Sequence, residues 1–154
     1  MRRHDALIPL SHDHHHALVR ARRLRLAGEA VDVEDQRAAA DEFLRFFGDD
    51  GVQHFREEEE ILFPLVIDRP DTPTDLLSRL LLEHVQMHSL VSRLRTEVDG
   101  GGPAPQTLRT IGELLAAHIR LEESELFPSM ERMLSEEDLG SIRLAPRVRT
   151  PPPR

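Results

Sequence analysis

Two segments of the chain repeat one another, and together they decide how the sequence folds. The first is His54-Phe-Arg-Glu-Glu-Glu-Glu-Ile-Leu-Phe-Pro64, and the second is His118-Ile-Arg-Leu-Glu-Glu-Ser-Glu-Leu-Phe-Pro128. Both begin with His, carry Glu four residues later and end in Leu-Phe-Pro. Residues four apart share one face of an α-helix, so each segment can direct an imidazole and a carboxylate to one point.

Two shorter motifs extend the same pattern to the other predicted helices. Asp13-His14 and Glu83-His84 both place a carboxylate directly before a histidine, and His88 follows His84 by four residues. The chain therefore reads as two helical hairpins. Each hairpin has a histidine in its first helix and a His-Glu pair in its second.

Hydrophobic periodicity predicts four helices joined by short turns. Gly28, the two prolines of the segment 68–73 and the run Gly100-Gly-Gly102 mark the turns. Short connections between amphipathic helices favour an all-α fold, an up-down-up-down four-helix bundle. The predicted helices cover residues 11–27, 33–66, 74–98 and 105–134.

Local signals refine this prediction. Gly48 and Gly51 fall inside the second predicted helix, where two glycines should weaken or bend it. The segment Ser135-Glu-Glu-Asp138 carries a capping signal for one short extra C-terminal helical turn. We expect residues 1–145 to form the bundle, and the tail at 146–154, rich in proline and arginine, to be disordered.

Composition excludes several classes of function. The 154 residues suffice for one domain, and the absence of Cys and Tyr removes disulfides, thiolate metal sites and tyrosine-based redox chemistry. A net charge of −8 makes nucleic acid an unfavourable partner. No apolar run is long enough for a membrane span, and the N-terminus lacks the apolar core of a signal peptide. We therefore expect a cytoplasmic protein with no membrane association.

Candidate metal ligands fall on the apolar stripes of all four predicted helices. A glutamate on such a stripe is rarely buried unless it is paired or bound to a metal. A single histidine on an apolar face is usually a hydrogen-bonded core residue, but a matched set on four helices is hard to explain in that way. The candidates are His14, His54, Glu58, His84, His88, His118 and Glu122.

The first helix needs a choice among neighbouring histidines. His14 shares a stripe with Leu10 and Leu18, so the helical period favours it. His15 lies at the border of this stripe and is the alternative. His12 and His16 fall on the side that carries arginines, so we expect them to be exposed.

Five imidazoles and two carboxylates suit iron, zinc, manganese or copper better than calcium or magnesium. The Glu-x-x-His pairs of ferritin-type centres and the His-Glu-x-x-His pattern of zinc proteases are both absent. A redox or structural transition-metal site is therefore the prediction from the residues alone.

The combined motifs resemble the hemerythrin-like, HHE cation-binding family over about residues 10–130. The resemblance implies a four-helix bundle around an oxo- or hydroxo-bridged di-iron centre, with zinc or manganese as alternatives. Glu58 and Glu122 would bridge the two irons. One departure is that a Glu follows the fourth-helix histidine by four residues, where the oxygen-carrying hemerythrins place an Asp at five. The implied ligands are His84, His88 and His118 on one iron and His14 and His54 on the other.

The resemblance implies reversible binding or sensing of O2 or another small diatomic molecule. The alternative is a di-iron enzyme or iron-handling protein that acts on peroxide or nitric oxide, and a purely structural metal bundle is a third reading. His88 would complete the coordination of the iron held by His84 and His118. The coordination position left open for a small molecule would therefore lie on the iron of His14 and His54. We expect its walls to be apolar, from Leu18, Phe47, Leu62 and Leu115.

Overall fold

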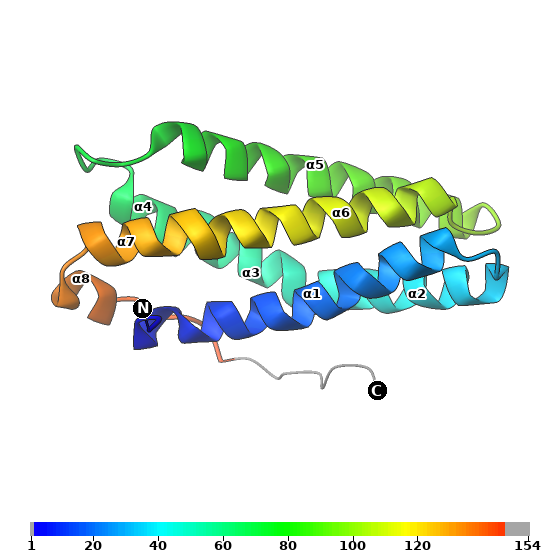
Figure 1. Ribbon diagram of the computed structural model, residues 1–154, viewed down its shortest axis with the longest axis horizontal. Helices are drawn as coiled ribbons and strands as arrows, with labels where there is room; N and C mark the ends of the chain where they lie inside the picture. Colours follow the sequence, from blue (N-terminus) through cyan, green and yellow to red (C-terminus); the bar gives the residue numbers. More distant parts are fainter. Residues whose placement is uncertain (1, 147–154) are drawn as a thin grey trace.

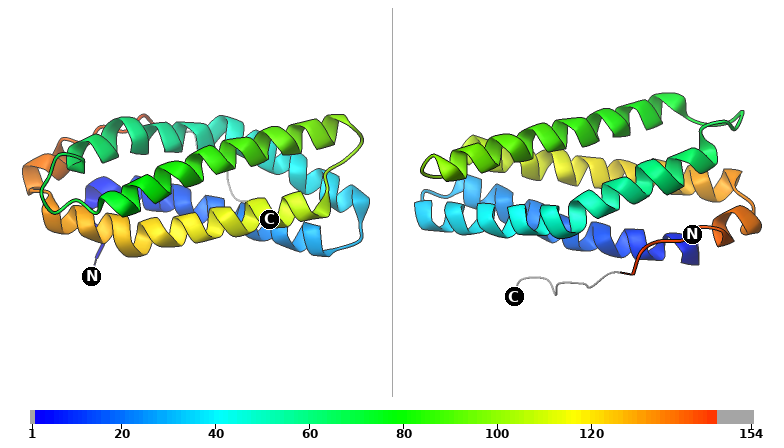
Figure 2. Two further views of the ribbon diagram at one scale, coloured as in Figure 1. Left: turned by 90° about the horizontal axis from the view of Figure 1, so that it is seen from above. Right: turned by 180° about the vertical axis from the view of Figure 1, so that it is seen from behind.

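The computed structural model describes residues 2–146 and contains only helices and turns in that range. Four long helical segments run antiparallel, as Figures 1 and 2 show, in the up-down-up-down order that the sequence predicts. None of the helices in residues 2–146 has the length and apolar character needed to cross a lipid bilayer. The elements are η1 (Asp5–Leu7), α1 (Ile8–Glu29), α2 (Val33–Phe46), η2 (Phe47–Gly51), α3 (Val52–Glu57), η3 (Glu58–Leu62), α4 (Phe63–Val66), α5 (Thr74–Asp99), α6 (Pro105–Leu121), η4 (Glu122–Leu126), α7 (Phe127–Met133) and α8 (Glu136–Gly140).

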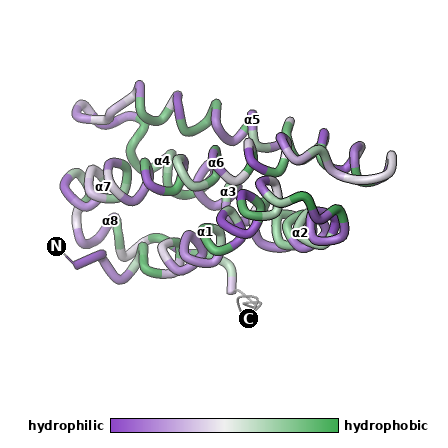
Figure 3. Tube along the Cα trace, turned by 45° about the vertical axis from the view of Figure 1, so that its right-hand side comes forward, coloured by the Kyte–Doolittle hydropathy of each residue, from purple (hydrophilic) through white to green (hydrophobic). Residues whose placement is uncertain are grey.

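The helices form a ring of four neighbours. α1 packs against α2 and α6, and α5 packs against the same two helices. Along α5, hydrophobic and hydrophilic residues alternate (Figure 3), as expected for a helix with one buried face. Its inward stripe consists of Leu77, Leu80, His84, Met87, Val91 and Leu94.

Local sequence explains the helix ends. Asp32 caps α2 by accepting hydrogen bonds from the backbone N–H groups of Glu34 and Asp35. Gly101 and Gly102 adopt φ angles of 130° and 154°, which L side chains rarely adopt, in the turn before α6. Ser135 forms the predicted capping box of α8. The predicted tail lies outside the described residues except for Pro146.

The second and fourth helices are continuous but contain π-helical turns, the elements η2, η3 and η4. η3 begins at Glu58, and its closing bond runs from the N–H of Phe63 to the carbonyl of Glu58. η4 repeats this geometry from Glu122. The Leu-Phe-Pro motifs therefore do not terminate their helices, because the wider turn before each proline lets the helix continue, to Val66 and Met133 respectively.

The glycines of the second helix produce the predicted irregularity as the π turn η2. Gly51 is packed so tightly against the Phe47 ring that a Cβ atom would lie 2.7 Å from it. A larger residue at this position would push the ring away, so Gly51 fixes the place of Phe47.

Two apolar clusters fill the interior, and a polar layer separates them along the bundle. One cluster joins α2 to the C-terminal half of α1, to the C-terminal half of α5 and to α6. The other joins the N-terminal ends of α1 and α5 to α4 and α7. The polar layer between them consists of His14, His54, Glu58, His84, His118 and Glu122.

Candidate metal centre

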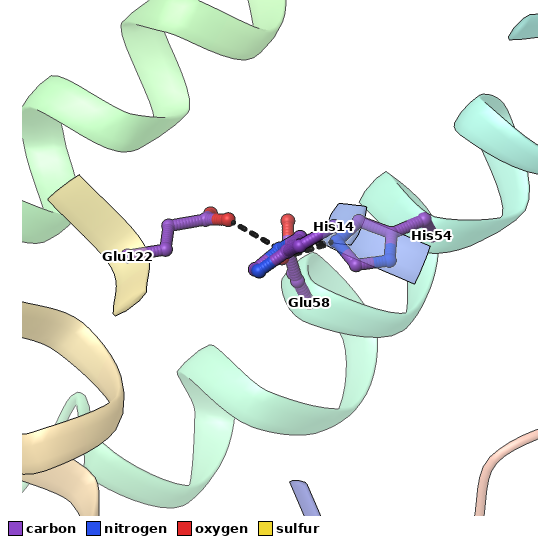
Figure 4. A group of neighbouring side chains, drawn as sticks. All are labelled: His14, His54, Glu58 and Glu122. Carbon is purple, nitrogen blue, oxygen red and sulfur yellow. Dashed lines mark hydrogen bonds and ion pairs between the residues drawn. The ribbon is translucent and has the colours of Figure 1, made fainter. Parts of the chain in front are cut away.

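Six buried side chains from all four helices converge on the polar layer. Their ligand atoms form two groups, within each of which all atoms lie within 4.8 Å of one another. Figure 4 shows the first group, His14 and His54 with the two glutamates. The second group contains His84 and His118 with the same two glutamates. Both groups therefore share Glu58 and Glu122.

Each glutamate directs one oxygen toward each pair of histidines. Glu58 Oε1 lies 2.7 Å from His54 Nε2, and Glu58 Oε2 lies 3.2 Å from His84 Nε2. Glu122 Oε2 lies 2.9 Å from His14 Nε2, and Glu122 Oε1 lies 3.0 Å from His118 Nε2. This is the arrangement expected of two carboxylates that bridge two cations.

The imidazoles of each pair meet through their Nε2 atoms. These atoms are 3.1 Å apart in His14 and His54 and 3.2 Å apart in His84 and His118. All four oxygens of Glu58 and Glu122 are buried without a hydrogen bond of acceptable geometry, although imidazole nitrogens are close. Nitrogen and oxygen lone pairs thus face a common space. A cation in this space would satisfy them, whereas apolar surroundings alone would not.

A second layer of carboxylates accepts hydrogen bonds from the outer side of the rings. A carboxylate at Nδ1 holds the proton there and leaves the Nε2 lone pair free for a metal. Three of these contacts are hydrogen bonds, and the contact of His118 with Glu83 is a longer ion pair. The Nδ1 contacts are His14 with Glu123 at 2.7 Å, His54 with Asp13 at 3.0 Å, His84 with Glu59 at 2.7 Å and His118 with Glu83 at 3.6 Å.

The sequence pattern alone assigned no role to these four outer carboxylates. The available signal was their position, since each is adjacent in sequence to a predicted ligand. Their partners lie on other helices, however, so only the packed bundle reveals the pairs.

The electrostatics of the centre favour positive charge. Burial alone would lower the pKa of His54, but the negative charge of Glu58, whose Oε1 lies 2.7 Å from Nε2, and the hydrogen bond to Asp13 outweigh it and raise this pKa to about 9. For His118 burial is likewise outweighed, chiefly by the negative charge of Glu122, whose Oε1 lies 3.0 Å from Nε2, and the pKa rises to about 10. Without a metal, protons on the imidazoles would partly balance the carboxylates.

His88 is the predicted ligand that the structure does not bring to the centre. Its side chain is exposed and belongs to neither group, and its ring packs edge-on against Phe47 at 5.6 Å and Phe55 at 5.9 Å between ring centroids. The inward stripe of α5 passes from His84 to Met87, so four residues carry His88 too far around the helix.

The histidines of α1 separate as the helical period predicts, with one exception. His14 lies in the first group, while His12 and His15 are exposed. His16 is only partly exposed, because it borders a pocket beside the centre. Arg20, on the same side of α1, is 7% exposed, and it donates a hydrogen bond to the His16 carbonyl at 3.3 Å.

This pocket has a volume of about 40 Å³ and extends from the surface to the polar layer. Phe47 and Leu115 line it, as expected, but Leu18 and Leu62 do not. Arg20 lines it and also stacks over the Phe46 ring at 4.5 Å. A few water-sized molecules or one diatomic molecule would fit in this volume.

The fold and the buried histidine–carboxylate layer define a metal-binding four-helix bundle. The family model of the hemerythrin HHE cation-binding domain matches residues 6–130, and the chain therefore belongs to that family. Neither the curated proteins nor the solved structures that were searched gave a match.

Proposed function

We propose that this protein holds two iron ions at the polar layer and binds O2, or another small neutral diatomic molecule, reversibly beside them. The proposed ligands are His14 and His54 for one ion and His84 and His118 for the other. Glu58 and Glu122 would be shared. Zinc or manganese remains the alternative for this donor set.

The proposal rests on how the oxygens of the two glutamates are shared between the two histidine pairs. Glu58 and Glu122 each offer one oxygen to each histidine pair, at 2.7 to 3.2 Å from the nearest Nε2 atom. Mixed imidazole and carboxylate donors suit iron, whereas all-oxygen sites suit magnesium and calcium. When bound, iron would supply the reversible change of oxidation state that the chain's own side chains lack.

The surrounding residues support a small neutral ligand. Part of the pocket wall is apolar, since Phe47, Leu115 and Ile119 offer no hydrogen bond to a charged molecule. The charged residues Asp13, Arg20 and Asp50 line the rest of it. The outer carboxylates, such as Glu123 on His14, hold the imidazoles in the tautomer and orientation that a metal requires. These residues line the pocket, orient the imidazoles and limit the access of water, whereas the change of oxidation state would come from the metal.

Because His88 is exposed, it is not placed to complete the ligands of one ion, and the open coordination position is no longer assigned by the ligand count. Without it, each ion would receive two imidazoles and a share of two carboxylates, so the ligands alone do not distinguish the two positions. Fewer protein ligands leave more room for exogenous molecules at the centre. This observation favours the second candidate function, a di-iron enzyme or iron-handling protein that acts on peroxide or nitric oxide.

Metal analysis followed by rapid mixing tests the proposal. Protein from iron-replete cells should contain about two iron ions per chain. The reduced protein should develop a visible absorption band on mixing with O2, and the band should disappear when O2 is removed. Irreversible oxidation with no such band would favour the peroxide or nitric oxide alternative, and one zinc with no iron would overturn the di-iron proposal. His88→Ala, which alters an exposed ring, is the matched control.

A further inference from the structure

Arg3 lies in the segment before α1 and is hydrogen-bonded to the C-terminal part of the fourth helix. Its Nη1 donates to Glu131 Oε1 at 2.6 Å, and its Nη2 donates to Glu123 Oε2 at 2.8 Å and to the Glu123 carbonyl at 3.0 Å. Figure 1 shows the N-terminus at the same end of the bundle as α7, which carries Glu131. The side chains of Arg3 and Glu131 are 21% and 8% exposed, so solvent screens these charge-assisted hydrogen bonds less than it would on an open surface.

One of these acceptors also contacts a proposed metal ligand. Glu123 uses its other oxygen, Oε1, to contact His14 Nδ1 at 2.7 Å. Arg3 and His14 thus occupy different oxygens of the same carboxylate, and Arg3 also binds the main chain of that residue. The rigid fork of the guanidinium therefore restrains the carboxylate in the orientation that meets His14.

The Phe127 ring forms a second link between the same two residues. Its plane is inclined by 12° to that of the His14 ring, with centroids 5.4 Å apart, and the central carbon of the Arg3 guanidinium lies 5.1 Å from its centroid. Cation–π attraction favours this contact between the guanidinium and the ring. Arg3 therefore contacts both the carboxylate at the outer nitrogen of His14 and the aromatic ring stacked on it.

The internal repeat provides a comparison within the same molecule. Glu59 takes the place of Glu123 in the first repeat segment, and its Oε1 also lies 2.7 Å from the Nδ1 atom of its histidine, His84. Within residues 2–146, however, no arginine forms an ion pair with Glu59. The two outer hydrogen bonds are equal in length, but only that of His14 is supported by a guanidinium.

We infer that Arg3 is a positioning residue of the metal centre, which fixes Glu123 and Phe127 against His14 and thereby strengthens the metal position of His14 and His54. The inference rests on the proposed function for the assignment of His14 as a ligand. Arg3 acts through its two neighbours and not as a ligand, because a guanidinium has no acceptor lone pair to offer a cation.

Charge and positioning predict opposite effects on metal binding. The positive charge of Arg3 by itself repels a nearby cation, so a pure charge effect would make metal binding tighter once Arg3 is removed. Loss of the orientation that Arg3 provides would instead weaken metal binding. Changing a direct hydrogen-bond partner of a ligand typically costs 10- to 100-fold in metal affinity, and for a residue one contact further out we expect about tenfold.

The substitution Arg3→Gln tests the inference, and Arg2→Gln is the matched control. Arg2 is the neighbouring residue, and its ion pair with Asp5 is exposed, with side chains 84% and 80% accessible. Calorimetric titration of the metal-free full chain uses zinc, which binds imidazole and carboxylate donors without a change of oxidation state. In Arg3→Gln one of two zinc-binding events should weaken about tenfold. In Arg2→Gln both should keep their wild-type affinity.

Nitrogen-15 NMR of the imidazole rings in the zinc-loaded protein gives a second readout, which a general loss of stability would not reproduce. The Nδ1 proton of His14 should exchange slowly with solvent in the wild-type protein and in Arg2→Gln, and faster in Arg3→Gln. The Nδ1 proton of His84 should be unaffected, because Arg3 binds Glu123 and not Glu59. If Arg3→Gln loses its helical circular dichroism, Arg3→Lys serves in its place, since lysine keeps the charge but lacks the forked geometry.

The outcomes separate this inference from the proposed function. Zinc affinity that stays at the wild-type value or increases in folded Arg3→Gln would overturn the inference and leave the proposed function intact. Equal acceleration of exchange at His14 and His84 would also overturn it. If His14→Ala bound zinc as well as the wild-type protein, the proposed ligand set would be wrong, while proton exchange at His14 in the metal-free chain would still show whether Arg3 fixes its contact with Glu123.

Discussion

Removing the metal from the intact chain should lower its melting temperature, and the buried carboxylates set the size of the effect. Glu58 and Glu122 are fully buried, and none of their four oxygens accepts a hydrogen bond of acceptable geometry. A buried charged group left without its partner costs about 1–3 kcal/mol or more. Protons on His54 and His118 would offset part of this in the metal-free state, since the pKa values of both are raised.

Binding linkage gives a consistent magnitude. Two metal ions, each at a free concentration of about a hundredfold its Kd, would together stabilise the folded state by roughly 5 kcal/mol. We therefore expect the metal-free protein to be less stable by roughly 3–6 kcal/mol. For a chain of this size, each kcal/mol corresponds to about 2–4 °C, so the melting temperature should fall by roughly 6–24 °C.

The assay is thermal unfolding followed by circular dichroism at pH 7, before and after chelation and dialysis. Returning Fe²⁺ without oxygen, or Zn²⁺, should restore the midpoint. Mg²⁺ should not restore it, because it binds poorly to imidazole donors. Equal midpoints for the metal-free and metal-loaded proteins would refute the reasoning, since the buried carboxylates would then be satisfied by the protein alone.

Three further predictions concern single side chains. His84→Ala should reduce the metal content measured by mass spectrometry from about two ions per chain toward one, whereas His88→Ala should leave it unchanged; equal losses would show that the exposed ring does bind metal. Glu123→Gln should weaken metal binding about 10- to 100-fold in calorimetric titrations, because the outer hydrogen bond keeps its geometry but loses its charge; wild-type affinity would contradict this role. Metal-free protein should lose stability as the pH rises from about 6.5 to 10, because the pKa values of His54 and His118 are raised to about 9 and about 10 and their stabilising effect is complete only below the pKa of the unfolded chain. Denaturant unfolding at several pH values should show a loss of about 3 kcal/mol in the free energy of unfolding for His54 alone. A stability that does not change with pH would contradict the linkage.

The sequence by itself determined the helices and most of the inward-facing polar residues. The spacing of residues within one segment sets both whether it forms a helix and on which face each side chain lies. The i and i+4 repeats at His54 and His118 were therefore sufficient to predict which side chains share a face. The same local logic selected His14 over His15, and the two are buried and exposed respectively. It also identified the glycines that distort the second helix, now seen as the π turn η2.

Only the tertiary structure decided how far each helix is rotated about its own axis. His84 and His88 differ by about 40° around α5, which sequence periodicity does not resolve. Packing against α2 and α6 turns Met87 inward and leaves His88 exposed. The outer carboxylates and the pocket escaped prediction for a related reason. Glu123 reaches His14 across 109 positions of sequence, and the pocket lies between α1, η2 and α6, so both exist only once helices distant in the chain are side by side.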